Sequence, residues 1–302
     1  MNNKTIIITY HKDAYFFPYI KDKNIKVFEP IRNKSLLTRI MFRIPFLCLF
    51  TYGFRNELKT AKKVIIFDSA YNELLGKYLK FKMKDKVFLY FWNPISKTYS
   101  GKANKIISNA KKIMPVYSFD HNDCENFKIS YRPMVYSSDV NDCIDIIKET
   151  KYDLFFLGWK KDRSNQIEKL YNEYFKGKIK CLFILVGDEE RVIDDSIIYT
   201  RNRIPYSKYL DYFLNSRCIL DIPQEGQEGL TIRNVECLFF RKKMITTNAC
   251  IVHYDYYNEN NTLILDNNHK KDLNCFINSD YIDIDENIKR KYDFKYWIES
   301  FG

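Results

Sequence analysis

The sequence predicts an α/β protein built from two Rossmann-like domains that face one another. Apolar, strand-like runs alternate with helical segments, which is the pattern of a parallel sheet covered by helices on both faces. This alternation stops near residue 120 and begins again near residue 150. A chain of 302 residues with 46% hydrophobic content is also long enough for two cores rather than one.

The first series of strands occupies the amino-terminal part of the chain. The predicted strands are TIIITY (5–10), KVIIFD (63–68), KVFLYFW (86–92) and KIMPVYS (112–118), with a helix over 70–83. A polar residue closes or follows each strand: His11, Asp68, Asn93 and Asp120. Ligands gather at the carboxyl ends of strands in open α/β sheets, so these are candidate site residues. Asp and Asn at such positions also commonly cap the next helix.

The second series begins after an irregular stretch over 120–150, which is typical of a connector. YDLFFLGWKKDR, from residue 152, predicts a strand followed by a polar loop. Further strands are predicted in KCLFILVG, RCILDIP and KKMITTN. We therefore expect domains over 1–140 and 150–285, and a final helix over 286–302 that packs back across the domain junction.

Positive charge is concentrated in the amino-terminal part. Residues 1–120 contain 23 Lys and Arg against eight Asp and Glu, whereas the remainder contains 26 against 30. This asymmetry favours an anionic partner: a phospholipid surface, a nucleic acid or a polyanionic glycolipid. An AT-rich coding sequence, which enriches Lys, Asn, Ile and Tyr together, is an alternative cause.

The segment LLTRIMFRIPFLCLFTYGFR (36–55) mixes apolar residues with Arg39, Arg43 and Arg55. Spanning a bilayer takes about 20 predominantly apolar residues, which this segment does not supply. It suits a helix that lies in a membrane interface with its arginines among the headgroups. A buried helix with snorkelling arginines fits the same residues.

The eight cysteines are widely spaced and include no C-x-x-C, so neither a zinc site nor a disulfide framework is predicted. Cys181 and Cys218 fall within predicted strands, where a thiol behaves as a small buried hydrophobe. The amino terminus has no signal-peptide pattern. We expect a cytoplasmic protein, peripheral at the inner face of the cytoplasmic membrane.

Residues 206–248 contain the runs GLTIRNVE (229–236) and KKMITTN (242–248). This stretch resembles the carboxyl-terminal nucleotide-sugar domain of GT-B glycosyltransferases, especially bacterial enzymes of lipopolysaccharide-core, O-antigen and capsular polysaccharide synthesis. DLFFLGWKKDR is more weakly similar to that domain's first strand and loop. The resemblance implies the GT-B architecture, sugar transfer from a nucleotide-diphosphate donor, and a glycolipid or oligosaccharide acceptor.

The pyrophosphate of such a donor requires backbone N–H groups and the positive end of a helix dipole. Gly229, Leu230 and Thr231 are expected to supply the N–H groups, and Gly229 permits a close approach of the backbone. Thr231 either caps the helix or donates its hydroxyl. A plain helix start without a ligand is the alternative.

Cations for the phosphates are expected from Arg233 and from the loop that contains Gly158, Lys160 and Lys161. A clamp of this kind also stabilises the departing diphosphate, so binding and catalysis would share residues. The alternative is that Arg233 and Lys160 are solvated surface charges.

In retaining GT-B enzymes one glutamate binds the ribose hydroxyls, and another, eight residues earlier, lies near the sugar. The resemblance assigns these roles to Glu236 and Glu228, which have the E-x7-E spacing. The usual motif sets its Gly-Leu pair five residues before the second glutamate, whereas Gly229 stands seven before Glu236.

An inverting enzyme needs a base beside the acceptor hydroxyl, and His11 and Asp68 are the best placed candidates. No metal or cofactor is expected, because cationic side chains and a helix end can neutralise the diphosphate; the nucleotide-diphosphate sugar is a co-substrate.

Two other functions fit the sequence. One is a catalytically inactive scaffold of a polysaccharide assembly complex, since folds outlive their chemistry. The other is a nucleic-acid-binding protein, suggested by positive charge together with 24 Tyr and 23 Phe. The basic residues are scattered rather than gathered in a motif, so no nucleic-acid partner is expected.

Overall fold

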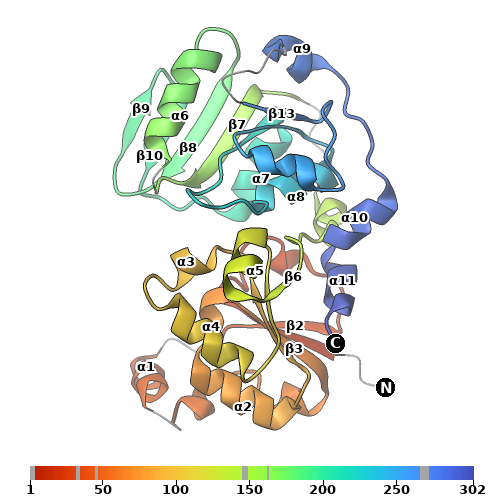
Figure 1. Cartoon of the computed structure of the whole chain (residues 1–302). Coiled ribbons are helices and arrows are strands. Elements are labelled where there is room, and N and C mark those ends of the chain that lie inside the picture. The colour runs from red at the N-terminus through yellow and green to blue at the C-terminus, as the bar shows by residue number, and fades with distance from the viewer. Residues whose placement is uncertain (1–3, 32–34, 45–46, 145–148, 162, 266–271) are drawn as a thin grey trace. The chain divides into compact units, whose positions relative to one another are not determined.

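The computed structural model describes residues 4–31, 35–44, 47–144, 149–161, 163–265 and 272–302. The chain divides into two compact units. The first comprises Met1–Val140 together with Asp293–Gly302, and the second comprises Asn141–Tyr292. Each unit has its own sheet flanked by helices, which confirms the prediction of two α/β domains (Figure 1).

In its described residues the first unit forms a six-stranded parallel sheet of order β2-β1-β3-β4-β5-β6. The strands are β1 (Lys4–Ile8), β2 (Ile25–Phe28), β3 (Ala61–Phe67), β4 (Val87–Phe91), β5 (Val116–Ser118) and β6 (Ser130–Tyr131). The helices are α1 (Leu36–Arg43), α2 (Glu73–Met83), α3 (Ile95–Thr98), α4 (Ala103–Lys111) and α5 (His121–Phe127). Strand β1 pairs with both β2 and β3, so the strand order reverses direction there.

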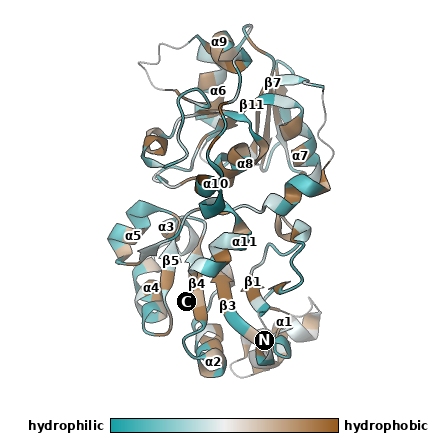
Figure 2. Cartoon of the chain, turned by 90° about the vertical axis from the view of Figure 1, so that its right-hand side faces the viewer, coloured by the Kyte–Doolittle hydropathy of each residue, from teal (hydrophilic) through white to brown (hydrophobic). Residues whose placement is uncertain are grey.

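Successive side chains of a strand point to opposite faces, and each face of this sheet has its own cover. On one face, Ile6 and Ile8 of β1 are fully buried in a cluster that includes Leu75 and Leu79 of α2. Strand β4 appears hydrophobic along its length, as a strand covered on both faces should (Figure 2).

Aromatic residues of the carboxyl-terminal segment cover the other face of the first sheet. The ring of Trp297 packs 4.6 Å from that of Tyr90 and 5.9 Å from that of Phe67, measured between centroids. The Trp297 indole N–H donates to the carbonyl of Pro133 at 3.1 Å. The carboxyl-terminal segment therefore belongs to the first unit and contributes the buried Trp297 to its core.

The described residues of the second unit form a seven-stranded sheet of order β13-β12-β11-β7-β8-β10-β9. The strands are β7 (Tyr152–Trp159), β8 (Cys181–Val186), β9 (Arg191–Ile193), β10 (Ile197–Thr200), β11 (Ser216–Asp221), β12 (Lys243–Thr246) and β13 (Thr262–Ile264). The helices are α6 (Ser164–Leu170), α7 (Tyr206–Leu214), α8 (Ile232–Phe240), α9 (Leu273–Asn278) and α10 (Glu286–Tyr292). The sheet is parallel except for the β9–β10 hairpin. Cys181 and Cys218 are buried in β8 and β11, as predicted.

Two sequence expectations about local structure are wrong. The stretch over 120–150 contains α5 and β6, because the Asp120 carboxylate caps α5 by accepting from the backbone N–H groups of Asn122 and Asp123. The predicted final helix is broken at Asp293 into α10 and a short helix α11 (Phe294–Trp297). The break occurs where the Phe294 amide donates to the carbonyl of Tyr136 at 2.7 Å.

The predicted interfacial segment over 36–55 forms α1 and a 3₁₀ turn, η2 (Leu47–Thr51). Leu36 and Ile40 of α1 are exposed, so the alternative of a buried helix is wrong for this segment. The side chains of Arg39 and Arg43 lie outside the described residues. Within the described residues, no helix combines the length and the apolar character that a membrane crossing demands.

We predict that Trp297→Ala lowers the free energy of unfolding by about 3–5 kcal/mol, because it removes a large aromatic side chain from a packed core. Urea denaturation followed by tryptophan fluorescence and circular dichroism measures the change. The neighbouring Tyr296 is exposed, so Tyr296→Ala is the matched control, expected within about 0.5 kcal/mol of wild type. Equal losses in the two variants would contradict the packing described for the last ten residues.

Candidate functional site

Each sheet reverses its strand order at one point, and ligands of open α/β sheets bind beside the carboxyl ends of the strands at such points. In the first unit the reversal falls between β1 and β3, which are followed by His11 and Asp68. In the second unit it falls between β7 and β11. Strand β7 ends at Trp159, so Gly158, which was expected in the loop, lies within the strand. Lys160 and Lys161 follow β7, and the run leading into α8 follows β11.

Asp221, the last residue of β11, organises the second of these edges. Its carboxylate is fully buried and accepts hydrogen bonds from the Thr231 hydroxyl at 2.6 Å and the Thr246 hydroxyl at 3.2 Å. The Asn234 amide donates to it at 3.1 Å, and the Arg233 guanidinium lies 3.2 Å away. One carboxylate thus joins β11, β12 and the first turn of α8, and the sequence analysis did not single it out.

Arg233 is buried rather than solvated, with 8% of its surface exposed. Besides Asp221, it donates to the carbonyl of Leu157 at 3.2 Å, and its guanidinium stands 4.9 Å from the centre of the Phe156 ring. The alternative of a surface charge is therefore wrong for Arg233. Its cation is balanced inside the protein, so it contributes less net positive charge to this edge than an unpaired arginine would.

Arg163 is a second buried arginine here that the sequence analysis did not assign. It donates to the carbonyl of Ile222 at 2.8 Å and to that of Trp159 at 2.7 Å, which ties the end of β7 to the end of β11. A Cβ atom at Gly158 would lie 3.0 Å from the Phe156 ring and 3.2 Å from the Arg163 guanidinium. Glycine at position 158 therefore permits this packing.

Lys160 is partly exposed and ion-paired. Its amino group lies 2.9 Å from the Glu189 carboxylate and 3.3 Å from that of Asp188, both in the loop after β8. The hydrogen bond to Glu189, followed by that to Asp188, raises the pKa of Lys160. The neighbouring Lys161 is exposed and has a left-handed backbone, with φ of 41°.

Gly229, Leu230 and Thr231, which were expected to supply backbone N–H groups, lie in different environments. The Thr231 N–H donates to the side-chain oxygen of Asn234 at 2.6 Å, so it is used by the start of α8 itself. Thr231 is the N-cap of α8, in agreement with one of the two roles expected for it. Gly229 and Leu230 are buried, and the Gly229 carbonyl accepts from the Gln227 amide at 3.1 Å.

The two glutamates of the E-x7-E pair have opposite environments. Glu228 is exposed, whereas Glu236 is fully buried on α8. The Tyr206 hydroxyl donates to the Glu236 carboxylate at 2.6 Å, and the Tyr209 hydroxyl donates to its other oxygen. Burial raises the pKa of Glu236 to about 7, against the lowering effect of the two hydroxyls. The sequence offered no signal for this tyrosine pair beyond its presence in α7.

In the first unit His11 belongs to an aromatic group at the strand ends. Its ring lies 5.6 Å from that of Tyr15 and 5.5 Å from that of Trp92, and it is partly exposed. Tyr15 and Trp92 also pack edge to face at 5.3 Å. The residues that follow β1 and β4 thus place an imidazole beside aromatic rings at the carboxyl edge of the sheet.

Asp68 is buried beside this group. Its carboxylate accepts from the backbone N–H of Trp92 at 2.8 Å and from the side-chain amide of Asn93. Burial raises its pKa to about 7, which these hydrogen bonds oppose. The residue has a positive φ of 35°, a strained conformation for a side chain other than glycine. A carboxylate held in this way fixes the turn after β4.

Within the described residues, no three His, Cys, Asp or Glu side chains gather as metal ligands would. The sequence contains one Asp-x-Asp triplet after β13, at 283–285. Asp283 pairs with Arg241 at 3.2 Å, and Asp285 accepts from the backbone N–H of Asn287.

No protein-family model and no curated protein matches the chain. Among solved structures, the chain is similar to the DNA-modifying enzyme β-glucosyltransferase, determined in the presence and absence of its substrate uridine diphosphoglucose. Identity is 14% and the TM-score is 0.49, over 86% of this chain and 84% of that one. A likeness this distant says nothing about the donor or acceptor of the present chain.

We predict that Asp221→Ala lowers the free energy of unfolding by about 3–5 kcal/mol, because it leaves the buried Arg233 cation without its carboxylate. Urea denaturation measures the change. Glu225→Ala removes an exposed carboxylate from the same loop and serves as the control, with an expected effect within about 0.5 kcal/mol. A loss below about 1 kcal/mol in Asp221→Ala would show that the pair does not hold this edge together.

A second prediction concerns pH. The pKa of Glu236 is about 7 in the folded protein and 4.5 ordinarily, so the folded state retains a proton that the unfolded state has lost. That stabilisation is fully present below about pH 4.5 and disappears as the pH rises through 7. Glu236→Gln, which has no proton to lose, should therefore gain up to about 3 kcal/mol relative to wild type between pH 4.5 and 8.

Urea midpoints of both proteins, measured across this pH range, test the prediction. Glu225→Gln at an exposed position should follow the wild-type curve. Parallel curves for wild type and Glu236→Gln would mean that Glu236 is ionised at an ordinary pH in the folded protein.

Proposed function

We propose that this protein is a glycosyltransferase that moves a sugar from a nucleotide-diphosphate donor to a glycolipid or polysaccharide acceptor in bacterial surface polysaccharide synthesis. One observation carries the proposal. The run GLTIRNVE, which resembles the donor-binding motif of GT-B enzymes, begins α8 at the point where the second sheet reverses its strand order. Motif and topology thus select the same edge independently.

The donor diphosphate binds at the start of α8 in this proposal. The helix has nine residues, and the positive end of its dipole favours an anion. Because the Thr231 N–H is used within the helix, the proposal assigns the backbone contacts of the diphosphate to Gly229 and Leu230. Lys160 supplies a cation by exchanging its partners Asp188 and Glu189 for phosphate oxygens.

The buried Arg233 and Glu236 have different roles in the proposed donor site. Arg233 holds the first turn of α8 against Asp221 and the end of β7, so it positions the helix start. Glu236 meets the ribose hydroxyls once Tyr206, which is only partly buried, rotates away from its carboxylate. Glu228 is exposed and directly precedes Gly229, so the proposal assigns it to the sugar of the donor.

The first unit supplies the acceptor side. His11 is partly exposed among Tyr15 and Trp92, and aromatic faces of this kind suit the apolar face of a sugar ring. If transfer inverts the anomeric centre, His11 is therefore the base that takes the proton from the acceptor hydroxyl. Asp68, buried and hydrogen-bonded to Trp92 and Asn93, keeps the aromatic group in place.

Nucleotide binding tests the proposal first. We expect one of UDP, GDP, CMP and dTDP, alone or as its sugar conjugate, to stabilise the protein by about 2.7 kcal/mol at a hundred times its Kd. Thermal unfolding of the purified protein measures this shift. Lys160→Ala should weaken it, whereas Lys169→Ala, which removes an exposed ion-paired lysine from α6, should not. Release of free sugar or its transfer to a lipid extract is then measured with the stabilising donor.

The outcomes separate the alternatives. If no nucleotide shifts the unfolding temperature at about 1 mM, a concentration that would detect even weak binding, the donor site is disproved. A donor that binds but is neither hydrolysed nor transferred would indicate a scaffold without catalysis.

A further inference from the structure

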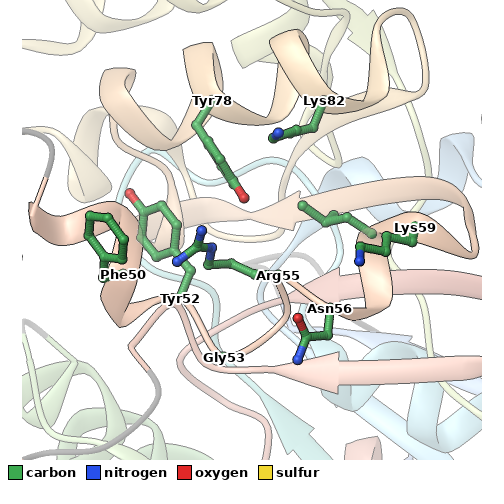
Figure 3. Close-up of a pocket in the computed structure, with 9 residues that line it drawn as sticks. Phe50, Tyr52, Gly53, Arg55, Asn56, Lys59, Tyr78 and Lys82 are labelled. Carbon is green, nitrogen blue, oxygen red and sulfur yellow. The ribbon is translucent and has the colours of Figure 1, made fainter.

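A hollow of about 570 Å³ opens on the first unit, between α2 and the segment that follows η2 (Figure 3). Arg55 and Lys59 line it from that segment, and Tyr78 and Lys82 line it from α2. The ring of Phe50 lies at its rim, with the Arg55 guanidinium 5.0 Å from the ring centre. We call this feature the basic hollow.

The basic hollow lies away from the candidate acceptor site. Lys59 comes just before β3 and Lys82 just before β4, at the amino edge of the parallel sheet. His11 and Asp68 follow β1 and β3, at the carboxyl edge. A ligand of the basic hollow is therefore distinct from whatever His11 meets.

The three cations of the basic hollow are exposed, and none forms an ion pair with another residue that the structure describes. The nearby carboxylates have other cationic partners: Glu57 pairs with Lys4 at 3.0 Å, Glu73 with Lys77 at 2.6 Å and Asp85 with Lys80 at 2.6 Å. The hollow thus presents uncompensated positive charge to an anion.

Exposed apolar side chains recur along the segment that leads to the basic hollow, which Phe50 lines. These side chains, three or four residues apart, are Leu36, Ile40, Ile44, Leu47 and Phe50, and we call them the apolar stripe. Leu36 is 75% exposed and Phe50 is 61% exposed. Helix α1 and η2, which carry four of the five, pack against each other. On the α2 side of the hollow, Phe81 is 79% exposed, with the Lys82 amino group 5.3 Å from its ring centre.

We propose that the apolar stripe and the basic hollow together dock the protein on an anionic phospholipid bilayer, with a lipid phosphate in the hollow. Aliphatic side chains gain by entering the acyl boundary, while the cations beside them remain among the headgroups. A nucleic acid would satisfy the cations but would leave Leu36, Ile40 and Leu47 in water, since aliphatic groups offer no stacking face. The inference does not depend on sugar transfer.

Co-sedimentation with lipid vesicles tests the proposal. The full chain should bind vesicles of phosphatidylcholine with about 30% phosphatidylglycerol much more tightly than vesicles of phosphatidylcholine alone. Replacing Arg55, Lys59 and Lys82 together by Ala should lower the partition coefficient at least tenfold, since each cation near an anionic surface contributes roughly fivefold. Leu36→Ser with Ile40→Ser should also weaken binding, because it removes apolar area from the stripe.

The matched control replaces Lys62, Lys102 and Lys105 by Ala, which removes the same charge from exposed positions of the same unit outside the hollow. This variant should keep at least half of the wild-type partition coefficient. Equal losses in the two triple variants would overturn the proposal in favour of net charge alone. Indifference of the wild type to phosphatidylglycerol would overturn it as well.

Two further readouts keep the interpretation clear. Far-UV circular dichroism of each variant establishes that it is folded, which the exposure of every substituted side chain leads us to expect. Nucleotide-induced stabilisation, measured on the same samples, should be unchanged, so failure of membrane docking and failure of the donor site are distinguishable. Tighter binding of a single-stranded oligonucleotide than of anionic vesicles, lost in the Arg55, Lys59 and Lys82 variant, would identify a nucleic-acid interface instead.

Discussion

The second unit depends on the buried carboxylate of Asp221. A parallel sheet delivers its strand ends to one edge, but it does not by itself set where the next helix begins. Asp221 does this by accepting from Thr231 and Asn234 at the start of α8 and from Thr246 at the end of β12, and by pairing with Arg233. An ionised group without these partners would be costly to bury. The loop, helix start and neighbouring strand are therefore specified together, and the start of α8 is fixed against the ends of β11 and β12.

Buried acids occur at both of the edges where strand order reverses, and in both units burial raises the pKa of a carboxyl group to about 7. Asp68 holds the residues after β4, and Glu236 is held by two tyrosines of α7. The ionised form of each of these buried groups destabilises the folded state, so each makes stability depend on pH. Carboxyl groups of this kind are common at functional sites. The cost is tolerated because each sheet has a large core on both faces. In the first unit that core includes Trp297 from the far end of the chain.

The first unit gathers different kinds of side chain at the opposite edges of its sheet. Imidazole and aromatic rings gather at the carboxyl edge, around His11 and Trp92. Cations without an ion-pair partner among the described residues gather near the amino edge, together with exposed apolar side chains, around Arg55 and Phe50. A parallel sheet permits this division because its loops alternate between the two edges.

The two mainly parallel sheets could be predicted from the sequence, because apolar runs alternating with amphipathic segments have few other ways to bury their faces. The sequence also placed Cys181, Cys218 and the α7–β11–α8–β12 succession correctly. Its assignment of a ligand to the loops after β7 and β11 stays a prediction. The burial and the hydrogen-bond partners of individual polar groups could not be predicted in this way and emerge only from the folded arrangement. Arg233 and Glu228 are both charged residues near a helix start, yet one is buried against Asp221 and the other is exposed. The break at Asp293 and the helix after Asp120 likewise depend on partners or caps that local propensity does not reveal. Burial and pairing are long-range properties, because they arise from which strand ends the sheet topology brings together.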